Sequence, residues 1–338
     1  MTGNIHTNHT TPIDAVITWV DGSDPQHIKK MSAFLKETNR NKIPGAHQTR
    51  FASVNEIKYC LLSILKFAPF VRNIFIITDN QDPQLHNDIK KFYPERITDI
   101  KIIDHKEIFA GFEKELPTFS SRSIETIMWR INDLSDNFIY FNDDTFLIRE
   151  TKRQDWFADD KPVLLGRWHT APWLRVIWQN AKKFFMKYII FDKTFQPRAS
   201  YHMGQWQAAK IAGYKTKYFC INHTPFALRK ETAENFFNNN REIIAKNIIH
   251  KFKNHNQFNF ISLLYHLELK NGGISIKKPD VAYLQPFKRH KKYVDNKIAL
   301  CKSNENIKFL CVQSLDICTQ EDIDKVFSWL EDILELKQ

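Results

Sequence analysis

The sequence predicts an α/β fold, in which a mainly parallel sheet has helices on both faces and a mostly helical C-terminal half covers a cleft. Between residues 13 and 166, short apolar segments rich in β-branched residues alternate with polar loops and helical patterns. Such alternation is typical of parallel sheets, because each strand needs a crossover back to the same edge. After residue 166 it gives way to aromatic and basic helical segments. We therefore expect an α/β core over 13–166 and a mostly helical region over 167–338.

The first half contains four segments with the composition of buried strands. They are the apolar runs 15–20, 73–78, 101–104 and 138–141. Polar loops at 21–24, 79–82 and 142–144 follow three of them and mark strand ends. Residues 53–69 and 121–131 show helical periodicity, and Ser53 with Glu56 has the spacing of a capping box.

The second half contains mainly helical patterns. Helices are expected over 201–213, 230–249 and 319–334, and over 255–271 with Gly272 and Gly273 as the stop signal. Short strands are expected over 217–220 and 308–312. These segments follow the α/β core in the chain, so we expect them to pack over its ligand-binding edge.

Residues 182–191, KKFFMKYIIF, mix lysines with bulky apolar side chains. Both a core helix with a basic rim and a segment in a membrane interface fit this mixture, and the core helix is the expectation. The N-terminus lacks the apolar core of a signal peptide, and no stretch approaches the roughly 20 apolar residues of a membrane span. We expect a cytoplasmic protein and leave open a peripheral contact with the inner face of the cell membrane.

The charge balance favours anionic partners. The chain has 49 Lys and Arg against 38 Asp and Glu, a formal charge of +11. The basic residues are scattered, whereas nucleic-acid readers concentrate them on one element, so no nucleic-acid partner is expected. The five cysteines show no Cys-x-x-Cys pair and no zinc spacing, and we expect free thiols.

Asn142, Asp143 and Asp144 directly follow the apolar run 137–141. Adjacent acids at the carboxyl end of a buried strand are suited to hold a divalent cation against a phosphate-bearing ligand. Asn-Asp-Asp is also ordinary turn chemistry. The carboxyl ends of parallel strands meet at one edge, where the loops 21–24 and 79–82 would converge on the acids, so the site is the favoured interpretation.

Several of these segments together resemble the Stealth family of sugar-phosphate transferases. This family includes bacterial capsular polysaccharide phosphotransferases and the lysosomal enzyme N-acetylglucosamine-1-phosphotransferase. Residues 13–25, IDAVITWVDGSDP, resemble its opening block, and residues 50–82 and 116–147 resemble its second block. His223-Thr224-Pro225 resembles the third block, and residues 308–316 a weak form of the fourth.

The resemblance implies a nucleotide-sugar transferase-like fold and activity. A hexose- or N-acetylhexosamine-1-phosphate would pass from a nucleotide sugar to a glycan hydroxyl, with release of a nucleoside monophosphate, in surface or capsular polysaccharide synthesis. Residues 13–166 would bind the donor, and 167–338 would form an acceptor and lid region of the same catalytic unit. Four positions depart from the family pattern: Leu62 replaces a common Arg, Arg122 a common His, and Lys251 and Lys253 common arginines.

The resemblance also assigns expected roles at the acidic pair. Asp143 and Asp144 would hold Mg²⁺ or Mn²⁺, with Asn142 aiding the geometry. His223 follows a predicted strand and has the chemistry of a general base at neutral pH. Cationic help to the phosphoryl oxygens is expected from Arg50, and Lys253 and Arg122 are further candidates.

The loop after the first strand is expected to hold the nucleotide base and ribose through backbone groups and a carboxylate. It comprises Thr18, Trp19, Val20, Asp21 and Gly22. Two other functions stay open: a metal-dependent glycosyltransferase, which would release a nucleoside diphosphate, and a noncatalytic glycan- or polyanion-binding protein. The residues identify neither the donor sugar and base nor the acceptor, and they do not indicate the oligomeric state.

Overall fold

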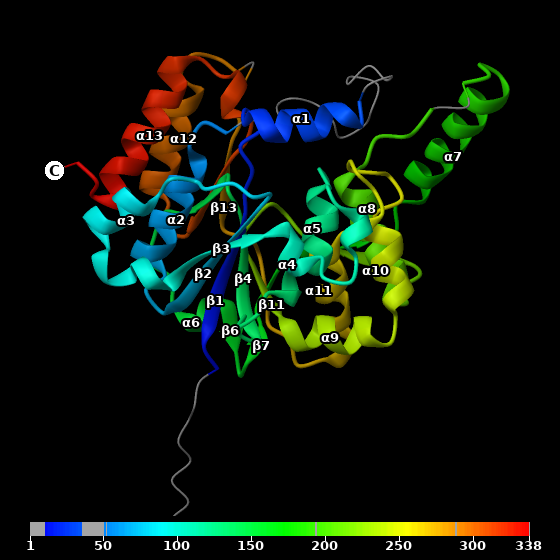
Figure 1. Ribbon diagram of the computed structural model, residues 1–338, viewed down its shortest axis with the longest axis horizontal. Coiled ribbons are helices and arrows are strands. Elements are labelled where there is room, and N and C mark those ends of the chain that lie inside the picture. The colour runs from blue at the N-terminus through cyan, green and yellow to red at the C-terminus, as the bar shows by residue number, and fades with distance from the viewer. Residues whose placement is uncertain (1–10, 36–50, 52, 193–194, 288, 338) are drawn as a thin grey trace, which may run out of the picture.

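A five-stranded sheet with four parallel strands forms the centre of the protein. The computed structural model describes residues 11–35, 51, 53–192, 195–287 and 289–337. The strand order is β11-β4-β1-β2-β3, and β11 runs antiparallel to β4 at one edge (Figure 1). The strands are β1 (Ile13–Thr18), β2 (Val71–Thr78), β3 (Ile100–Asp104), β4 (Asn137–Asn142) and β11 (Phe226–Arg229). The predicted mainly parallel α/β sheet is therefore confirmed.

Both faces of this sheet are covered by helices, as expected. Successive side chains of a strand point to opposite faces, and in β1 Ile17 joins one apolar cluster while Val16 joins the other. The helices between these strands are α1 (Pro25–Ala33), α2 (Glu56–Phe67), α3 (His86–Phe92), α4 (His105–Ile108) and α5 (Ser121–Ile127). Short 3-10 turns occupy Pro94–Asp99, Glu113–Glu115 and Met128–Arg130.

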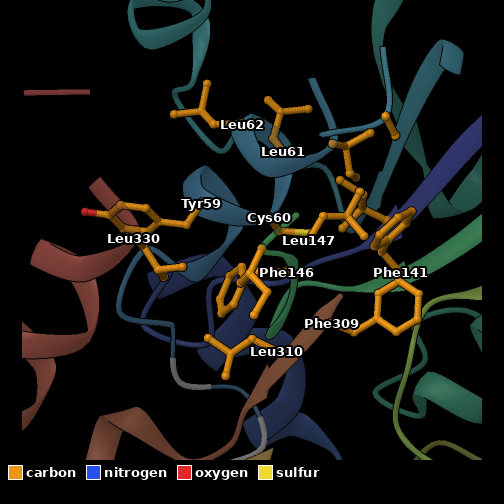
Figure 2. Packing of buried hydrophobic residues seen from close by; sticks show 14 of the residues in the cluster. Tyr59, Cys60, Leu61, Leu62, Phe141, Phe146, Leu147, Phe309, Leu310 and Leu330 are labelled. Carbon is orange, nitrogen blue, oxygen red and sulfur yellow. The ribbon is translucent and has the colours of Figure 1, made fainter. Parts of the chain in front are cut away.

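A second, three-stranded sheet packs beside α2. It contains β5 (Thr145–Leu147), β13 (Val281–Leu284) and β14 (Phe309–Val312) in the order β13-β14-β5. Figure 2 shows Phe146 and Leu310 from this sheet packed near Cys60 of α2. Leu62 belongs to the same apolar cluster and is 1% exposed. The departure at position 62 thus lies in the core.

The C-terminal half supplies most of the remaining elements. Its helices are α7 (Trp173–Tyr188), α8 (Tyr201–Ile211), α9 (Lys230–Asn238), α10 (Arg241–Ile248), α11 (Phe260–Asn271), α12 (Tyr293–Ser303) and α13 (Gln320–Leu334), with a 3-10 turn at Leu315–Ile317. Short strand pairs are β9 (Arg167–Thr170) with β10 (Lys217–Cys220), β8 (Leu164–Leu165) with β12 (Ile276–Lys277), and β6 (Phe157–Ala158) with β7 (Lys161–Pro162). The helix α6 (Arg153–Trp156) precedes β6.

Three local expectations are wrong. The single helix expected over 230–249 is two, broken at Asn239 and Asn240, whose side-chain amides donate to the carbonyls of Asn235 and Phe236. Such side-chain to backbone bonds compete with helix propagation. Asn259 caps α11, so that helix begins at Phe260 rather than near 255. The capping box at Ser53 is absent, because α2 begins at Glu56 after Asn55 in a left-handed conformation with φ 73°.

The segment 182–191 does not form the expected core helix. It continues α7, which has no buried residue and projects from the body of the protein (Figure 1). All five cysteines lie in the described part of the chain and are unpaired. Among the described residues, no helix combines the length and the apolar composition needed to cross a membrane.

Candidate active site

A cavity of about 620 Å³ lies at the carboxyl ends of the parallel strands. Thr18 and Asn142, the last residues of β1 and β4, are register partners and both line it. The C-terminal half also contributes lining residues, among them Tyr201, His223 and Lys253. Both halves of the chain therefore build one cavity, at the edge where parallel sheets bind ligands.

Of the three loops expected to meet there, 142–144 lines the cavity. Thr18, Trp19 and Val20, which precede the loop 21–24, also line it, whereas no residue of 21–24 or of the third loop, 79–82, does. In the third, the Gln81 side chain accepts from the backbone N–H of Asp21 and donates to its carbonyl, each at 2.9 Å. Asp79 accepts a hydrogen bond from Lys30 at 2.9 Å. The 79–82 loop thus holds the backbone of the first loop through the hydrogen bonds of Gln81 to Asp21.

The first loop divides into residues that face the cavity and residues that shape the turn. Thr18, Trp19 and Val20 line the cavity, whereas Asp21 and Gly22 are not among its lining residues. The Asp21 carboxylate accepts from the backbone N–H of Ser23 at 2.8 Å and from its hydroxyl at 2.6 Å. A Cβ on Gly22 would lie 2.2 Å from the carbonyl oxygen of Phe51, so only glycine fits this close approach.

Asp143 and Asp144 project carboxylates into the cavity from the turn between β4 and β5. The Thr145 hydroxyl donates to Asp144 Oδ1 at 3.2 Å, and the Val312 N–H donates to the Asp144 carbonyl at 2.9 Å. A bond across to β14 therefore holds the turn in place. Below it, the Tyr140 hydroxyl donates to Asn142 Oδ1 at 3.0 Å and bonds Thr18 Oγ1 at 2.9 Å.

Glu56 is a third carboxylate on the acidic wall, and the sequence analysis assigned it only to a helix cap. It lines the cavity, is 7% exposed, and accepts from the Val54 N–H at 2.7 Å. Burial first, and then mutual repulsion with the neighbouring carboxylates, raises the pKa of Asp143; burial and Glu56 likewise raise the pKa of Asp144, to about 6. Negative charge is therefore concentrated in a poorly solvated place.

This donor set fits a hard divalent cation. Mg²⁺ is commonly bound through one or two carboxylates, with substrate phosphates and water as its other ligands. No three Asp, Glu, His or Cys side chains of the described residues are grouped closely enough to enclose a metal by themselves. Asp143 and Asp144 can thus supply oxygen ligands of the right chemistry, while a bound phosphate would have to complete the coordination.

His223 also lines the cavity, from the loop between β10 and β11 where a strand end was expected. Its ring stacks on that of Tyr201, and its backbone N–H donates to the Tyr283 hydroxyl at 2.8 Å. Burial, and then the positive charge of Lys253, lowers the pKa of His223 to about 4. The imidazole is therefore neutral at pH 7 and can accept a proton.

The predicted cations have different surroundings. Lys253 lines the cavity, where its charge lowers the pKa values of Asp144 and Glu125 against the larger effect of burial. Arg122 also lines it, but its guanidinium donates to the carbonyls of Ser200, Asn254 and Gln257 at 2.8, 3.3 and 3.0 Å. Lys251 points elsewhere and donates to the Glu115 carbonyl at 2.8 Å. Arg50 lies outside the described residues.

Comparison with known proteins finds two matches to family models. The model of Stealth protein conserved region 1 matches residues 11–38, and that of conserved region 2 matches residues 50–165. Two conserved regions of Stealth proteins are thus matched within the first half of the chain. The two Stealth regions contain the first-loop residues and the acidic wall, whereas His223 and Lys253 lie beyond them. The resemblance of 223–225 and 308–316 to further Stealth blocks stays a prediction.

Named relatives match parts of the chain. Capsular polysaccharide phosphotransferase cps1A of Actinobacillus pleuropneumoniae is 42% identical over 154 residues, or 45% of this chain and 40% of that protein. Capsular polysaccharide phosphotransferase fcs1 of Haemophilus influenzae is 29% identical over 276 residues, or 82% of this chain and 70% of that protein. Several relatives are matched over only 25% to 40% of their own length.

A solved structure, of galactosyltransferase LgtC in complex with donor and acceptor sugar analogs, aligns with 96% of this chain and 95% of its own. Identity is 12% and the TM-score is 0.45. We draw nothing about the site from a likeness this distant. The α/β fold of this chain is established by its own strand order and direction.

Proposed function

We propose that this protein transfers a sugar-1-phosphate from a nucleotide sugar to a hydroxyl of a glycan acceptor. The acceptor oxygen attacks the phosphorus that bears the sugar, and the bond from that phosphorus to the bridging oxygen breaks. The bridging oxygen leaves with the other phosphate as a nucleoside monophosphate. The observation that carries the proposal is that two adjacent, partly buried aspartates and a neutral histidine line the same cavity.

Such a displacement needs positioning, charge neutralisation and removal of one proton. We assign the divalent-cation ligands to Asp143 and Asp144, with Asn142 held beside them by Tyr140. When bound, Mg²⁺ or Mn²⁺ would neutralise charge on the phosphate oxygens. His223 would accept the proton of the acceptor hydroxyl, since its imidazole is uncharged at pH 7.

Cationic side chains would meet the charge that develops on the transferred phosphoryl group. Lys253 is assigned this role in the cavity, and Arg50 keeps its proposed cationic role from the sequence. For Arg122 we propose contact with substrate mainly through the segments it holds at Ser200 and Asn254, because those carbonyls take up its guanidinium donors.

The first loop would bind the nucleotide. Thr18, Trp19 and Val20 face the cavity and would contact it, while Asp21 and Gly22 would set the turn that presents them. We propose that residues 13–166 hold the donor and that 167–338 provide the acceptor side and lid of the same unit. The proposed setting is surface polysaccharide synthesis in the cytoplasm, with peripheral contact at the inner face of the membrane.

The test identifies the nucleotide that is released. Purified protein is incubated with Mg²⁺, a panel of nucleotide sugars and glycan acceptors, and the nucleotides are separated by chromatography. We expect a monophosphate together with a phosphodiester-linked product by mass spectrometry, both lost in EDTA and in Asp144→Asn. A parallel incubation with the nucleoside diphosphate alone must yield no monophosphate, which excludes a contaminating phosphatase.

Release of a diphosphate with a product that lacks phosphate would replace the proposal with glycosyl transfer. Saturable binding of a nucleotide sugar without release of any nucleotide across the panel would favour the noncatalytic binding protein. These outcomes differ in the species measured, so a single chromatographic and mass analysis separates all three functions.

A further inference from the structure

The helix α7 presents an apolar face that the described part of the protein does not cover. Six large side chains recur along it at intervals of helical spacing, and each is at least half exposed, with Leu174 at 85% and Ile177 at 63%. They are Leu174, Ile177, Trp178, Phe184, Phe185 and Tyr188. At 3.6 residues per turn they occupy an arc of roughly 120° on one side of the helix. Ile189, Ile190 and Phe191 continue the exposed apolar surface.

The body of the protein holds α7 at its first turn. The Trp173 ring packs edge-to-face on Trp206 with centroids 5.7 Å apart, and Val176 packs on the cluster that contains Met203. Beyond this turn the helix projects away from α8 (Figure 1). The chain then returns at Ala199, which lines the cavity. The apolar face is thus fixed to the acceptor side of the site while it points away from the core.

The charge of α7 indicates what covers this face. The helix contains Arg175, Lys182, Lys183 and Lys187 and no acidic residue. The Lys182 and Lys187 ammonium groups lie 5.1 and 4.9 Å from the ring centroids of Trp178 and Tyr188. Their side chains can therefore cover the aromatic rings while the charges stay at the edge of the apolar arc.

A second copy of the chain is a poorer occupant than a lipid surface. Pairing two α7 helices would bring together two helices that each have four basic residues and no acidic one, and the like charges would repel. An anionic bilayer instead attracts the lysines and arginine and accepts the tryptophan and phenylalanine side chains in the same contact. Charge complementarity and the aromatic content both favour the bilayer.

We propose that α7 lies in the headgroup region of an anionic membrane, with Trp178 and Phe184 on the buried side and Lys182 and Lys187, which flank the apolar arc, beside the lipid phosphates. The inference rests on the proposed setting at a membrane and names the element and the lipid chemistry that would provide it. It does not depend on the reaction, because α7 contributes no lining residue to the cavity. Binding would hold the acceptor side of the cavity close to the membrane surface.

The test is flotation of the purified full chain with vesicles of phosphatidylcholine, with or without phosphatidylglycerol. We expect the protein to float with the anionic vesicles at low salt and to be released at high salt. Lys182→Glu with Lys187→Glu is expected to weaken this binding by roughly tenfold or more. The matched control, Lys90→Glu with Lys91→Glu, makes the same charge change at exposed positions of α3, on the other side of the molecule in Figure 1, and is expected to bind like wild type.

Phe184→Ser with Phe185→Ser tests the apolar contribution, and Leu300→Ser on exposed α12 is its control. Failure of the wild type to float with anionic vesicles overturns the proposal, and so does equal loss of binding in the α3 and α7 charge variants. A wild-type dimer that the Phe184 and Phe185 changes dissociate, with vesicle binding unaffected, would assign the face to a second copy. Nucleotide release with a soluble acceptor is measured on the same samples, so a failure of the reaction is distinguished from a failure of docking.

Discussion

The ring of His223 stacks on the ring of Tyr201, with centroids 4.4 Å apart and planes 18° from parallel. Tyr201 begins α8, and its hydroxyl donates to the Asn222 carbonyl at 3.2 Å, so one side chain positions both the imidazole and the backbone before it. Stacking fixes the plane of the imidazole, and burial keeps it neutral. The lowered pKa leaves the imidazole able to accept a proton at pH 7, but it also makes His223 a weaker base than a free imidazole.

The first prediction concerns this pair. His223→Gln is expected to lower kcat about 10²- to 10⁴-fold, the usual contribution of a general base, with little change in KM for the donor. Tyr201→Phe keeps the stacked ring and is expected to stay within about tenfold of wild type, since it loses one hydrogen bond. Steady-state kinetics of nucleotide release would check both. A His223→Gln enzyme with wild-type kcat would remove His223 from the mechanism.

The second prediction concerns the acidic pair in the absence of metal. Burial and mutual repulsion raise the pKa values of Asp143 and Asp144, so their ionised forms reduce stability at pH 7. Asp144→Asn is expected to raise the free energy of unfolding in EDTA by about 1–3 kcal/mol, from a shift of about two pKa units. The same variant should lose activity. Thermal unfolding in EDTA is the measurement.

In EDTA the Asp144→Asn variant is expected to be more stable than wild type, and adding Mg²⁺ should make wild type the more stable of the two. A ligand at 100 times its Kd stabilises the native state by about 2.7 kcal/mol, so Mg²⁺ with a nucleotide is expected to raise the Tm of wild type but not of Asp144→Asn. An equal Mg²⁺ shift in both proteins would place the ion elsewhere. The Asp160→Asn variant, at an acid outside the cavity lining, is the control and should respond like wild type.

The third prediction concerns the hydrogen bonds by which Arg122 connects α5 to the segments that contain Ser200 and Asn254. Arg122→Lys keeps the charge but cannot reach the carbonyls of Ser200, Asn254 and Gln257 together. It is expected to cost about 2–4 kcal/mol of unfolding free energy, since buried carbonyls lose their donors. Urea denaturation would measure this loss.

Gly204 offers a second test of the same contact. Its added Cβ would lie 2.9 Å from Arg122 Nη2, so Gly204→Ala is expected to destabilise the protein. Replacing glycine by alanine in an unobstructed helix raises the free energy of unfolding by about 0.5–1 kcal/mol. A decrease in the variant would therefore show that the added Cβ clashes with the guanidinium. Stabilisation by Gly204→Ala would mean that the guanidinium moves away freely.

The fourth prediction concerns the pH dependence of stability through His266. Its Nε2 accepts from the Phe219 N–H at 2.8 Å, and burial lowers its pKa to about 4. Below pH 6.5 the unfolded chain binds a proton at this residue that the folded protein excludes until about pH 4. Stability is therefore lost as pH falls through this window, by about 2 kcal/mol between pH 7 and pH 5 at 1.36 kcal/mol per pKa unit.

Urea denaturation of wild type and His266→Gln at both pH values would check this effect. The variant is expected to be less stable at pH 7 but to lose about 2 kcal/mol less on acidification. His86→Gln, at an exposed histidine, should leave the pH dependence as in wild type. Parallel pH profiles for His266→Gln and wild type would contradict the prediction.

The sequence was sufficient to predict the position of a residue where a local pattern and a general rule of folding determine it. Parallel strands end at one edge, so Thr18 and Asn142 could be placed together before their register was known. Glu56 was missed because Ser-x-x-Glu has the same spacing whether the glutamate caps a helix or faces a cavity. The only available signal was its place between the matched acids and the first strand.

Other features depend on contacts that no local pattern records. The guanidinium of Arg122 is held by carbonyls 78, 132 and 135 residues away in the chain. The mixture of lysines and bulky apolar residues over 182–191 led to the expectation of a core helix, but such a composition cannot distinguish a face that packs on a core from one that stays exposed. What decided that question was the absence of a neighbouring element, among the described residues, along most of this helix.

The last prediction concerns Leu62, which the sequence analysis identified as a departure from an expected arginine. Its side chain is 1% exposed and packs in the apolar cluster between α2 and the strands, outside the cavity lining. An arginine introduced here would be buried without a partner, so Leu62→Arg is expected to cost more than about 4 kcal/mol and not to improve catalysis. Leu62→Met, which nearly conserves volume, should cost less than about 1.5 kcal/mol. Urea denaturation of both variants is the measurement. A Leu62→Arg protein with the wild-type midpoint would show that an arginine in α2 can extend from the core to solvent or to the substrate, and the expected arginine could then act at the site from this position.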